Sequence, residues 1–138
     1  MKKISVIGLG FVGLPLACIL ASLKNKFMVI GIDKKVGNNP NSSKRNIINL
    51  FTKNLIDKKL ISLFKKSLKN KNFIFSNSFS NIKNSDVVIV SVNFDFQHGL
   101  INQSFNKLKK LFKEISLNLS KKTLIILETT VPPGTSEK

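Results

Sequence analysis

The hydrophobic residues of this chain fall into short continuous runs that alternate with longer amphipathic stretches. The short runs are aliphatic or aromatic with little period-2 alternation, and they occupy residues 4–8, 28–32, 73–75, 86–92 and 123–128. Runs of this kind are typical of strands that are buried on both faces, as in parallel sheets. The pattern therefore predicts five strands, of which 73–75 is the weakest.

The stretches between the strands have helical spacing. They cover residues 13–24, 55–68 and 104–119, and the last carries the clearest apolar stripe. A further short helix is expected between the third and fourth strands, and 37–46 is the most loop-like segment. Alternating strands and helices predict an α/β fold, a doubly wound parallel sheet with helices on both faces. We find no repeat or internal boundary, so residues 1–138 are interpreted as one domain.

Composition narrows the function classes. No apolar run approaches the roughly 18 residues that a membrane span needs. The start, Met1-Lys2-Lys3, is basic, but glycines interrupt the apolar stretch that follows, and no A-x-A cleavage site is present. The N-terminus is therefore interpreted as a first strand rather than a signal peptide. No membrane partner and a cytoplasmic location are expected.

The net charge of +16 comes almost entirely from lysine, with Arg45 as the one arginine. Nucleic-acid readers rely on the planar guanidinium fork, which lysine lacks. The charge is therefore interpreted as solvated surface, which still attracts anions such as nucleotides. With one cysteine, Cys18, and one histidine, His98, neither a disulfide nor a metal site is expected; Cys18 is interpreted as a core residue and His98 as a polar loop residue.

The chemistry-bearing motif is the G-x-G-x-x-G run Gly8-Leu9-Gly10-Phe11-Val12-Gly13. It follows the first predicted strand and opens the first predicted helix, which is the context of a dinucleotide-binding turn. Gly8 is expected to make the tight turn, Gly10 to admit the pyrophosphate, and Gly13 to let the helix pack on the sheet. The pyrophosphate is expected over residues 8–12, Phe11 and Val12 included, where backbone N–H groups and the helix dipole face an anion.

The second strand ends at Asp33, twenty residues after Gly13. A carboxylate there accepts hydrogen bonds from the adenosine ribose and repels a 2′-phosphate, which favours NAD over NADP. Lys34 and Lys35 follow at once and would suit a phosphate, so NADP is the alternative. A tight strand–helix turn that holds no ligand is the other alternative for the glycines.

Two segments resemble the UDP-glucose/GDP-mannose dehydrogenase family, the nucleotide-sugar 6-dehydrogenases. Residues 10–17, G-F-V-G-L-P-L-A, are similar to the family's helix opening, and Glu128-Thr129-Thr130-Val131-Pro132-Pro133-Gly134-Thr135 is similar to its loop after the fifth strand. The resemblance spans essentially the whole chain, as the N-terminal NAD-binding domain with a Rossmann fold. It implies oxidation of the C6 alcohol of a nucleotide sugar to a carboxylate with two NAD, in the synthesis of polysaccharide precursors.

The resemblance also implies roles for single residues. Thr130 matches the threonine that helps to position a water near the reacting carbon, beside the cofactor, and Glu128 begins the same loop at the nicotinamide end. Both roles are supporting ones, because the family's catalytic cysteine, lysine and sugar-binding domain lie beyond position 138. Cys18 is not that cysteine. The chain is therefore expected to be inactive alone, as a fragment, a truncated product or one part of a split enzyme whose C-terminal half is a separate chain.

One departure concerns the substrate. Many relatives carry a V-P-x-P turn after the fourth strand, whereas this chain reads Ser91-Val92-Asn93-Phe94-Asp95-Phe96. Some relatives that act on N-acetylated sugars also lack those prolines. Three other interpretations stay open at this point: a non-catalytic NAD-binding module, another Rossmann oxidoreductase such as a hydroxyacid dehydrogenase, and a basic nucleic-acid binder.

Overall fold

The structure is a computed structural model, and it describes residues 1–23, 26–36, 51–53, 57–94, 96, 101–120 and 122–137. The predicted loop 37–46 and His98 lie outside these residues, as do the first two positions of the helix predicted at 55–68.

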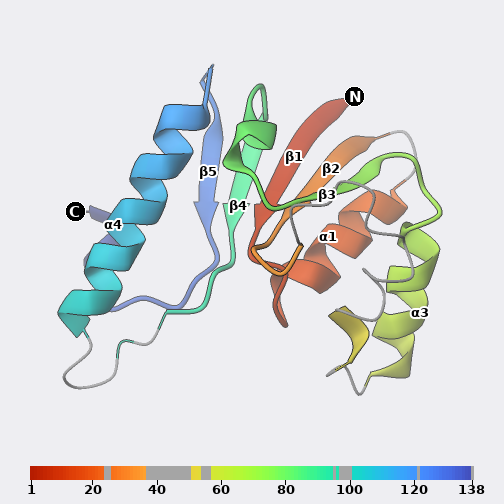
Figure 1. Cartoon of the computed structure of the whole chain (residues 1–138), viewed down its shortest axis with the longest axis horizontal. Coiled ribbons are helices and arrows are strands. Elements are labelled where there is room, and N and C mark those ends of the chain that lie inside the picture. Colours follow the sequence, from red (N-terminus) through yellow and green to blue (C-terminus); the bar gives the residue numbers. More distant parts are fainter. Residues whose placement is uncertain are drawn as a thin grey trace.

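Five parallel strands form one sheet in the order β3-β2-β1-β4-β5 (Figure 1). They are β1 (Lys2–Ile7), β2 (Phe27–Ile32), β3 (Phe73–Ser76), β4 (Val87–Val90) and β5 (Leu124–Leu127). Each predicted run overlaps one of them, so the five-strand prediction is confirmed. The order reverses between β1 and β4, because the chain first builds outwards from β1 to β3 and then returns to the other side of β1. Ligands gather at such a reversal in open α/β sheets.

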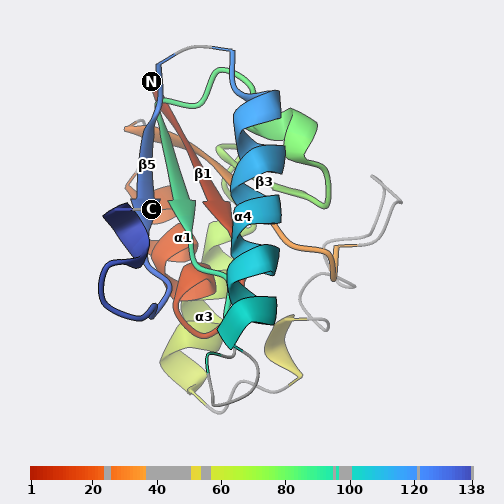
Figure 2. The same cartoon turned by 90° about the vertical axis from the view of Figure 1, so that its left-hand side faces the viewer.

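Helices cover both faces of the sheet, as predicted. Helices α1 (Gly13–Ser22) and α3 (Lys58–Ser67) pack together on one face. Helix α4 (Ile101–Asn118) and the short 3₁₀ helix η1 (Phe79–Ile82) pack together on the other, where α4 runs alongside the strands (Figure 2). A second 3₁₀ turn, η2 (Thr135–Glu137), follows β5.

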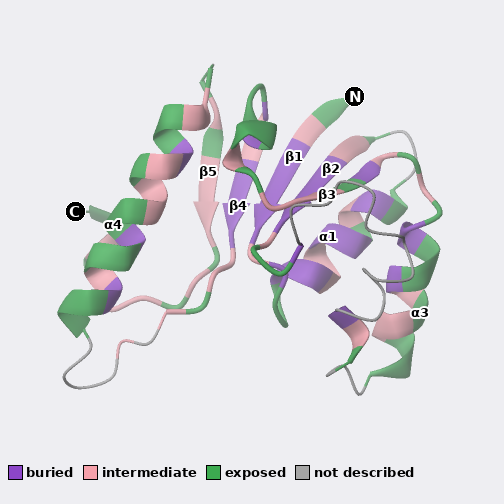
Figure 3. Cartoon of the chain, viewed as in Figure 1, coloured by how far each residue is buried: buried purple, intermediate pink, exposed green. Residues whose placement is uncertain are grey.

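Neighbouring residues of the central strands point into two separate cores, which explains why the strands lack alternation. Val6 belongs to the core under α1 and α3, whereas Ile7 belongs to the core under α4 and η1. In β4, Ile89 and Val90 divide in the same way. Figure 3 shows the result, with β1, β2 and β4 largely buried and the outer surfaces of α3 and α4 exposed.

Several element ends differ from the sequence predictions. Helix α4 begins at Ile101, three residues before the predicted start, and β4 ends at Val90 rather than 92. Although Ser91 has left the strand, its N–H still donates to the carbonyl of Ile7 at 2.8 Å. The first turn of α3 is capped by Asp57, whose carboxylate accepts from the N–H groups of Lys59 and Leu60 at 2.8 and 3.2 Å.

At two positions of the turn between β1 and α1 there is no space for a side chain. Gly8 has a φ of +89°, and a Cβ built on it would lie 2.6 Å from the carbonyl oxygen of Ser91. A Cβ on Gly13 would lie 1.9 Å from the carbonyl oxygen of Gly8. Gly10 differs, because a Cβ there meets nothing within 4 Å. Gly8 and Gly13 are therefore required by the fold itself, and Gly10 is not.

We predict that Gly13→Ala destabilises the domain, by about 2–3 kcal/mol, because the new methyl group must displace the turn or the helix. Alanine is otherwise the better helix former by about 1 kcal/mol, so a net loss identifies the clash. Urea unfolding measures the change, with Gly10→Ala as the matched control that should stay close to wild type. Equal stabilities for the two variants would contradict the prediction.

Candidate functional site

The glycine turn lies at the carboxyl edge of the sheet, beside the point where the strand order reverses. Its residues Gly10, Phe11 and Val12 are exposed, and the Phe11 side chain keeps 81% of its accessible surface. Gly10 faces open space. This is the local geometry that a pyrophosphate needs, because a ligand can approach the backbone without meeting a side chain.

The start of α1 adds donors to this exposed backbone. Val12 occupies the N-cap position and supplies no side-chain cap, and the first turn carries no acidic residue. The N–H of Leu14 is the first to bond back into the turn, at 3.1 Å to the carbonyl of Gly10. The first N–H groups of a helix lack intrahelical partners, and with the helix dipole they attract an anion. Helix α1 has no carboxylate side chain that could occupy this anion site in place of a ligand.

Asp33 follows β2 and lies directly beside the glycine turn. One carboxylate oxygen, Oδ2, accepts the Leu9 N–H at 2.8 Å, and the other, Oδ1, accepts the Lys35 N–H at 2.9 Å. The side chain is half-buried, and each oxygen keeps further acceptor capacity after one bond. The structure therefore brings the glycine turn and Asp33 together, as the fingerprint predicted. The exposed Lys34 follows at the same edge.

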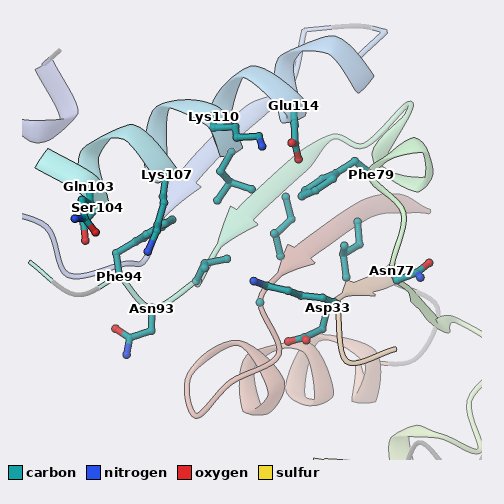
Figure 4. Close-up of a pocket in the computed structure, with 16 residues that line it drawn as sticks. Asp33, Asn77, Phe79, Asn93, Phe94, Gln103, Ser104, Lys107, Lys110 and Glu114 are labelled. Carbon is teal, nitrogen blue, oxygen red and sulfur yellow. The ribbon is translucent and has the colours of Figure 1, made fainter. Parts of the chain in front are cut away.

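A cavity of about 730 Å³ opens from Asp33 onto the α4 face of the sheet. Its inner surface is apolar and includes Ile7, Ile32 and Leu111. Lys107 and Lys110 extend into it from α4, with Phe79 and Glu114 further along (Figure 4). An apolar interior with cations at its rim suits a flat heteroaromatic ring attached to phosphates.

Sequence reasoning missed most of the residues that line this cavity. They come from three places, the segment from the end of β3 into η1, the segment that follows β4, and the inward face of α4; the missed ones are Asn77, Phe79, Val92, Asn93, Phe94, Gln103, Ser104, Lys107, Lys110 and Glu114. The three-residue spacing from Ser104 to Lys107 and Lys110 was visible as a helical face. Nothing in it distinguished a cavity wall from solvated surface.

Glu128 and Thr130 lie beyond the carboxyl end of β5, at the same edge but two strands away from β1. Both side chains are exposed. The residue between them, Thr129, anchors this loop, because its hydroxyl donates to the carbonyl of Val92 at 2.8 Å. The Glu128 N–H also donates, to Val90 at 2.9 Å. Thr129 had no assigned role from sequence. In the structure it is the half-buried residue between two exposed ones.

Cys18 is not part of this site. It is fully buried between α1 and α3, and the Ser67 hydroxyl donates to its Sγ at 3.5 Å. Burial raises the pKa of the Cys18 thiol to about 11, and the bond from Ser67 offsets part of that rise. A thiol held neutral in the core is a packing residue, as predicted, and not a nucleophile.

Within the part of the chain that the structure describes, no three His, Cys, Asp or Glu side chains gather in a way that could hold a metal ion. Over the same residues, no helix has the length and apolarity to cross a membrane.

Comparisons with known proteins agree with this geometry. Residues 2–138 match the model of the "UDP-glucose/GDP-mannose dehydrogenase family, NAD binding domain". The chain is 30% identical over 139 residues to a UDP-N-acetyl-D-mannosamine dehydrogenase of Campylobacter jejuni, covering 99% of this chain and 31% of that protein. It is also 30% identical to a UDP-glucose 6-dehydrogenase of Bacillus subtilis, covering 99% and 28%.

Among solved structures, an NDP-N-acetyl-D-galactosaminuronic acid dehydrogenase of Methanosarcina mazei superposes with a TM-score of 0.76 at 27% identity, over 99% of this chain and 29% of that one. A GDP-mannose dehydrogenase of Pseudomonas aeruginosa has a TM-score of 0.72 at 23% identity, over 99% and 30%, and shares the fold. The chain thus spans about three tenths of the length of these relatives. It belongs to the UDP-glucose/GDP-mannose dehydrogenase family and constitutes that family's NAD-binding domain.

Proposed function

We propose that NAD lies along the carboxyl edge of the sheet with its pyrophosphate over residues 8–12. Asp33 would accept the hydroxyls of the adenosine ribose, and the adenine ring would enter the cavity between the sheet and α4. The observation that carries this assignment is the bond between the Leu9 N–H and Asp33, which holds the phosphate turn and the ribose acceptor side by side. The open space at Gly10 fits the same ligand.

The nicotinamide would then point toward β5, where Glu128 and Thr130 are exposed. Bound NAD supplies a hydride acceptor, and oxidation of an alcohol to a carboxylate consumes two NAD and one water. In this arrangement Thr130 would position a water near the reacting carbon, and the loop would be held in place by Thr129. These are positioning tasks, which contribute by orientation rather than by bond formation.

The reaction proposed for the complete protein is oxidation of the C6 alcohol of a nucleotide sugar. The relatives support this class through their names, which include UDP-N-acetyl-D-mannosamine dehydrogenase and UDP-glucose 6-dehydrogenase. The proline-free segment after β4 favours a UDP-linked N-acetylated sugar. A polysaccharide precursor as product, a cytoplasmic location and the absence of a nucleic-acid partner stay predictions.

A non-catalytic role for the 138-residue chain is favoured by one specific observation. Its single cysteine is buried, with a pKa of about 11, so residues 1–138 supply no thiolate nucleophile. Together with the short span relative to its relatives, this points to a cofactor-binding unit whose catalytic groups come from other residues. A second polypeptide that carries the C-terminal half would be one source of those groups.

Gly10→Val tests the pyrophosphate position. The side chain enters open space in the free protein, so we expect a folded variant with a stability near wild type. It would occupy the phosphate approach, and NAD affinity should fall at least tenfold, which corresponds to about 1.4 kcal/mol. Calorimetric titration with NAD measures the loss. Unchanged affinity would show that the cofactor lies elsewhere.

Asp33→Ser tests the choice between NAD and NADP. The shorter side chain removes the negative charge near the 2′ position, so we expect the ratio of the NADP and NAD dissociation constants to shrink roughly tenfold or more. The ratio is the informative quantity, because any loosening of the glycine turn weakens both cofactors alike. Wild-type protein that bound NADP as tightly as NAD would refute the assignment.

The 138-residue chain should produce no NADH from UDP-glucose or UDP-N-acetylmannosamine while still binding NAD. The physical reason is the missing nucleophile, since Cys18 cannot form a thiolate in the folded domain at neutral pH. Absorbance at 340 nm follows the reaction, and a full-length relative serves as the positive control. Turnover by the 138-residue chain would mean that its chemistry has been misassigned.

A further inference from the structure

Leu9 is the one buried side chain in an otherwise open turn. Its exposed fraction is 2%, compared with 81% for Phe11 and 54% for Val12. It belongs to the core under α1 and α3. The turn that would carry the pyrophosphate is therefore attached to the protein interior through a single leucine.

The Leu9 side chain occupies the volume that a side chain on β2 would otherwise take. A Cβ built on Gly31 would lie 3.0 Å from Leu9 Cδ1 and 3.1 Å from Leu9 Cδ2, with the Phe73 ring at 3.4 Å. Glycine weakens a strand interior, so its presence in the middle of a buried parallel sheet indicates a close approach by another group. Here that group is the side chain from the glycine turn.

Two hydrogen bonds fix the turn to Ile32, the last residue of β2, and to Asp33, which follows it. The Gly8 N–H donates to the carbonyl of Ile32 at 2.8 Å, and the Leu9 N–H donates to Asp33 Oδ2 at 2.8 Å. Three consecutive residues, 31–33, thus hold the turn by one apolar and two polar contacts. Because one of the acceptors is Asp33, the position of the turn and the orientation of the carboxylate depend on each other.

We propose that Gly31 is a positioning residue for cofactor binding. By admitting the Leu9 side chain, it sets the distance between the phosphate turn and the Asp33 carboxylate, although Gly31 itself is buried and touches no ligand. This inference rests on the proposed function, which assigns the two groups to the pyrophosphate and the ribose. A ligand that bridges both groups needs their separation to be correct.

The test begins with Gly31→Ala. The added methyl group requires Leu9 to shift by a few tenths of an ångström, so the bond from the Leu9 N–H to Asp33 should weaken. NAD affinity should then fall, by up to roughly tenfold, within the range of coupling seen between contacting residues. Leu9→Val in the Gly31→Ala background removes the two δ carbons and should restore most of the affinity. If Gly31→Ala does not fold, Leu9→Ala takes its place, because it removes the contact without adding volume and should also weaken NAD binding.

Val29→Ala is the matched control. Val29 is fully buried, on the same strand as Gly31 and in the same core as Leu9. The hydrogen bonds of the glycine turn do not involve it. It should lower the free energy of unfolding while NAD affinity stays within about twofold. Calorimetry with NAD gives the affinities, and urea unfolding shows whether the two variants are destabilised to a similar extent.

Hydrogen exchange of the Leu9 amide, measured by NMR without cofactor, separates this inference from the proposed function. Faster exchange of the Leu9 amide in Gly31→Ala, reversed by Leu9→Val, supports the role of Gly31 in positioning the turn. If wild-type protein shows this behaviour but binds no NAD, the proposed function fails and the positioning of the turn by Gly31 stands. Gly31→Ala that matched wild type in NAD affinity and in Leu9 exchange would reduce Gly31 to a packing residue and overturn the inference.

Discussion

Three stretches of backbone meet at the carboxyl end of β1, and they can meet because two side chains are absent. The carbonyl of Gly8 lies where a Gly13 side chain would begin, and the carbonyl of Ser91 lies where a Gly8 side chain would begin. This close contact brings α1 onto the sheet and brings the segment after β4 against the turn. Two of the three fingerprint glycines are therefore required by the fold itself.

The site divides into two parts that are built differently. On the β2 side, the segment after β2 supplies Asp33 and α4 supplies the wall of a cavity, and lysines lie at its rim. On the β5 side, Glu128 and Thr130 are exposed on a loop that Thr129 fastens to the segment after β4. In the proposed function, the first part would hold the dinucleotide. The second part exposes Glu128 and Thr130 to solvent.

Sequence patterns predicted the elements better than their ends. The runs that became the central strands β1, β2 and β4 are buried on both faces, whereas the edge strands β3 and β5 keep exposed residues such as Ile74 and Leu124. The stripe of 104–119 became α4 because its apolar side packs on the sheet. The predicted strand 86–92 was too long, since β4 covers Val87–Val90. The early start of α4 was missed although Ile101 lies four residues before Phe105 and continues the apolar stripe. For the site, the spacing from Gly8 to Asp33 was sufficient to predict that turn and carboxylate would lie together.

By itself, the sequence determined the order of elements, the two-sided burial of the central strands, and the family, because these follow from local periodicity and from motifs of contiguous residues. Only the tertiary structure decided which groups touch across the sheet. The contact between Leu9 and Gly31, the bond from Leu9 to Asp33, and the convergence of Lys107 and Asp33 on one cavity join residues far apart in the chain. Such contacts depend on strand register and on the volumes of facing side chains, and these quantities are fixed only when the sheet and its helices pack together.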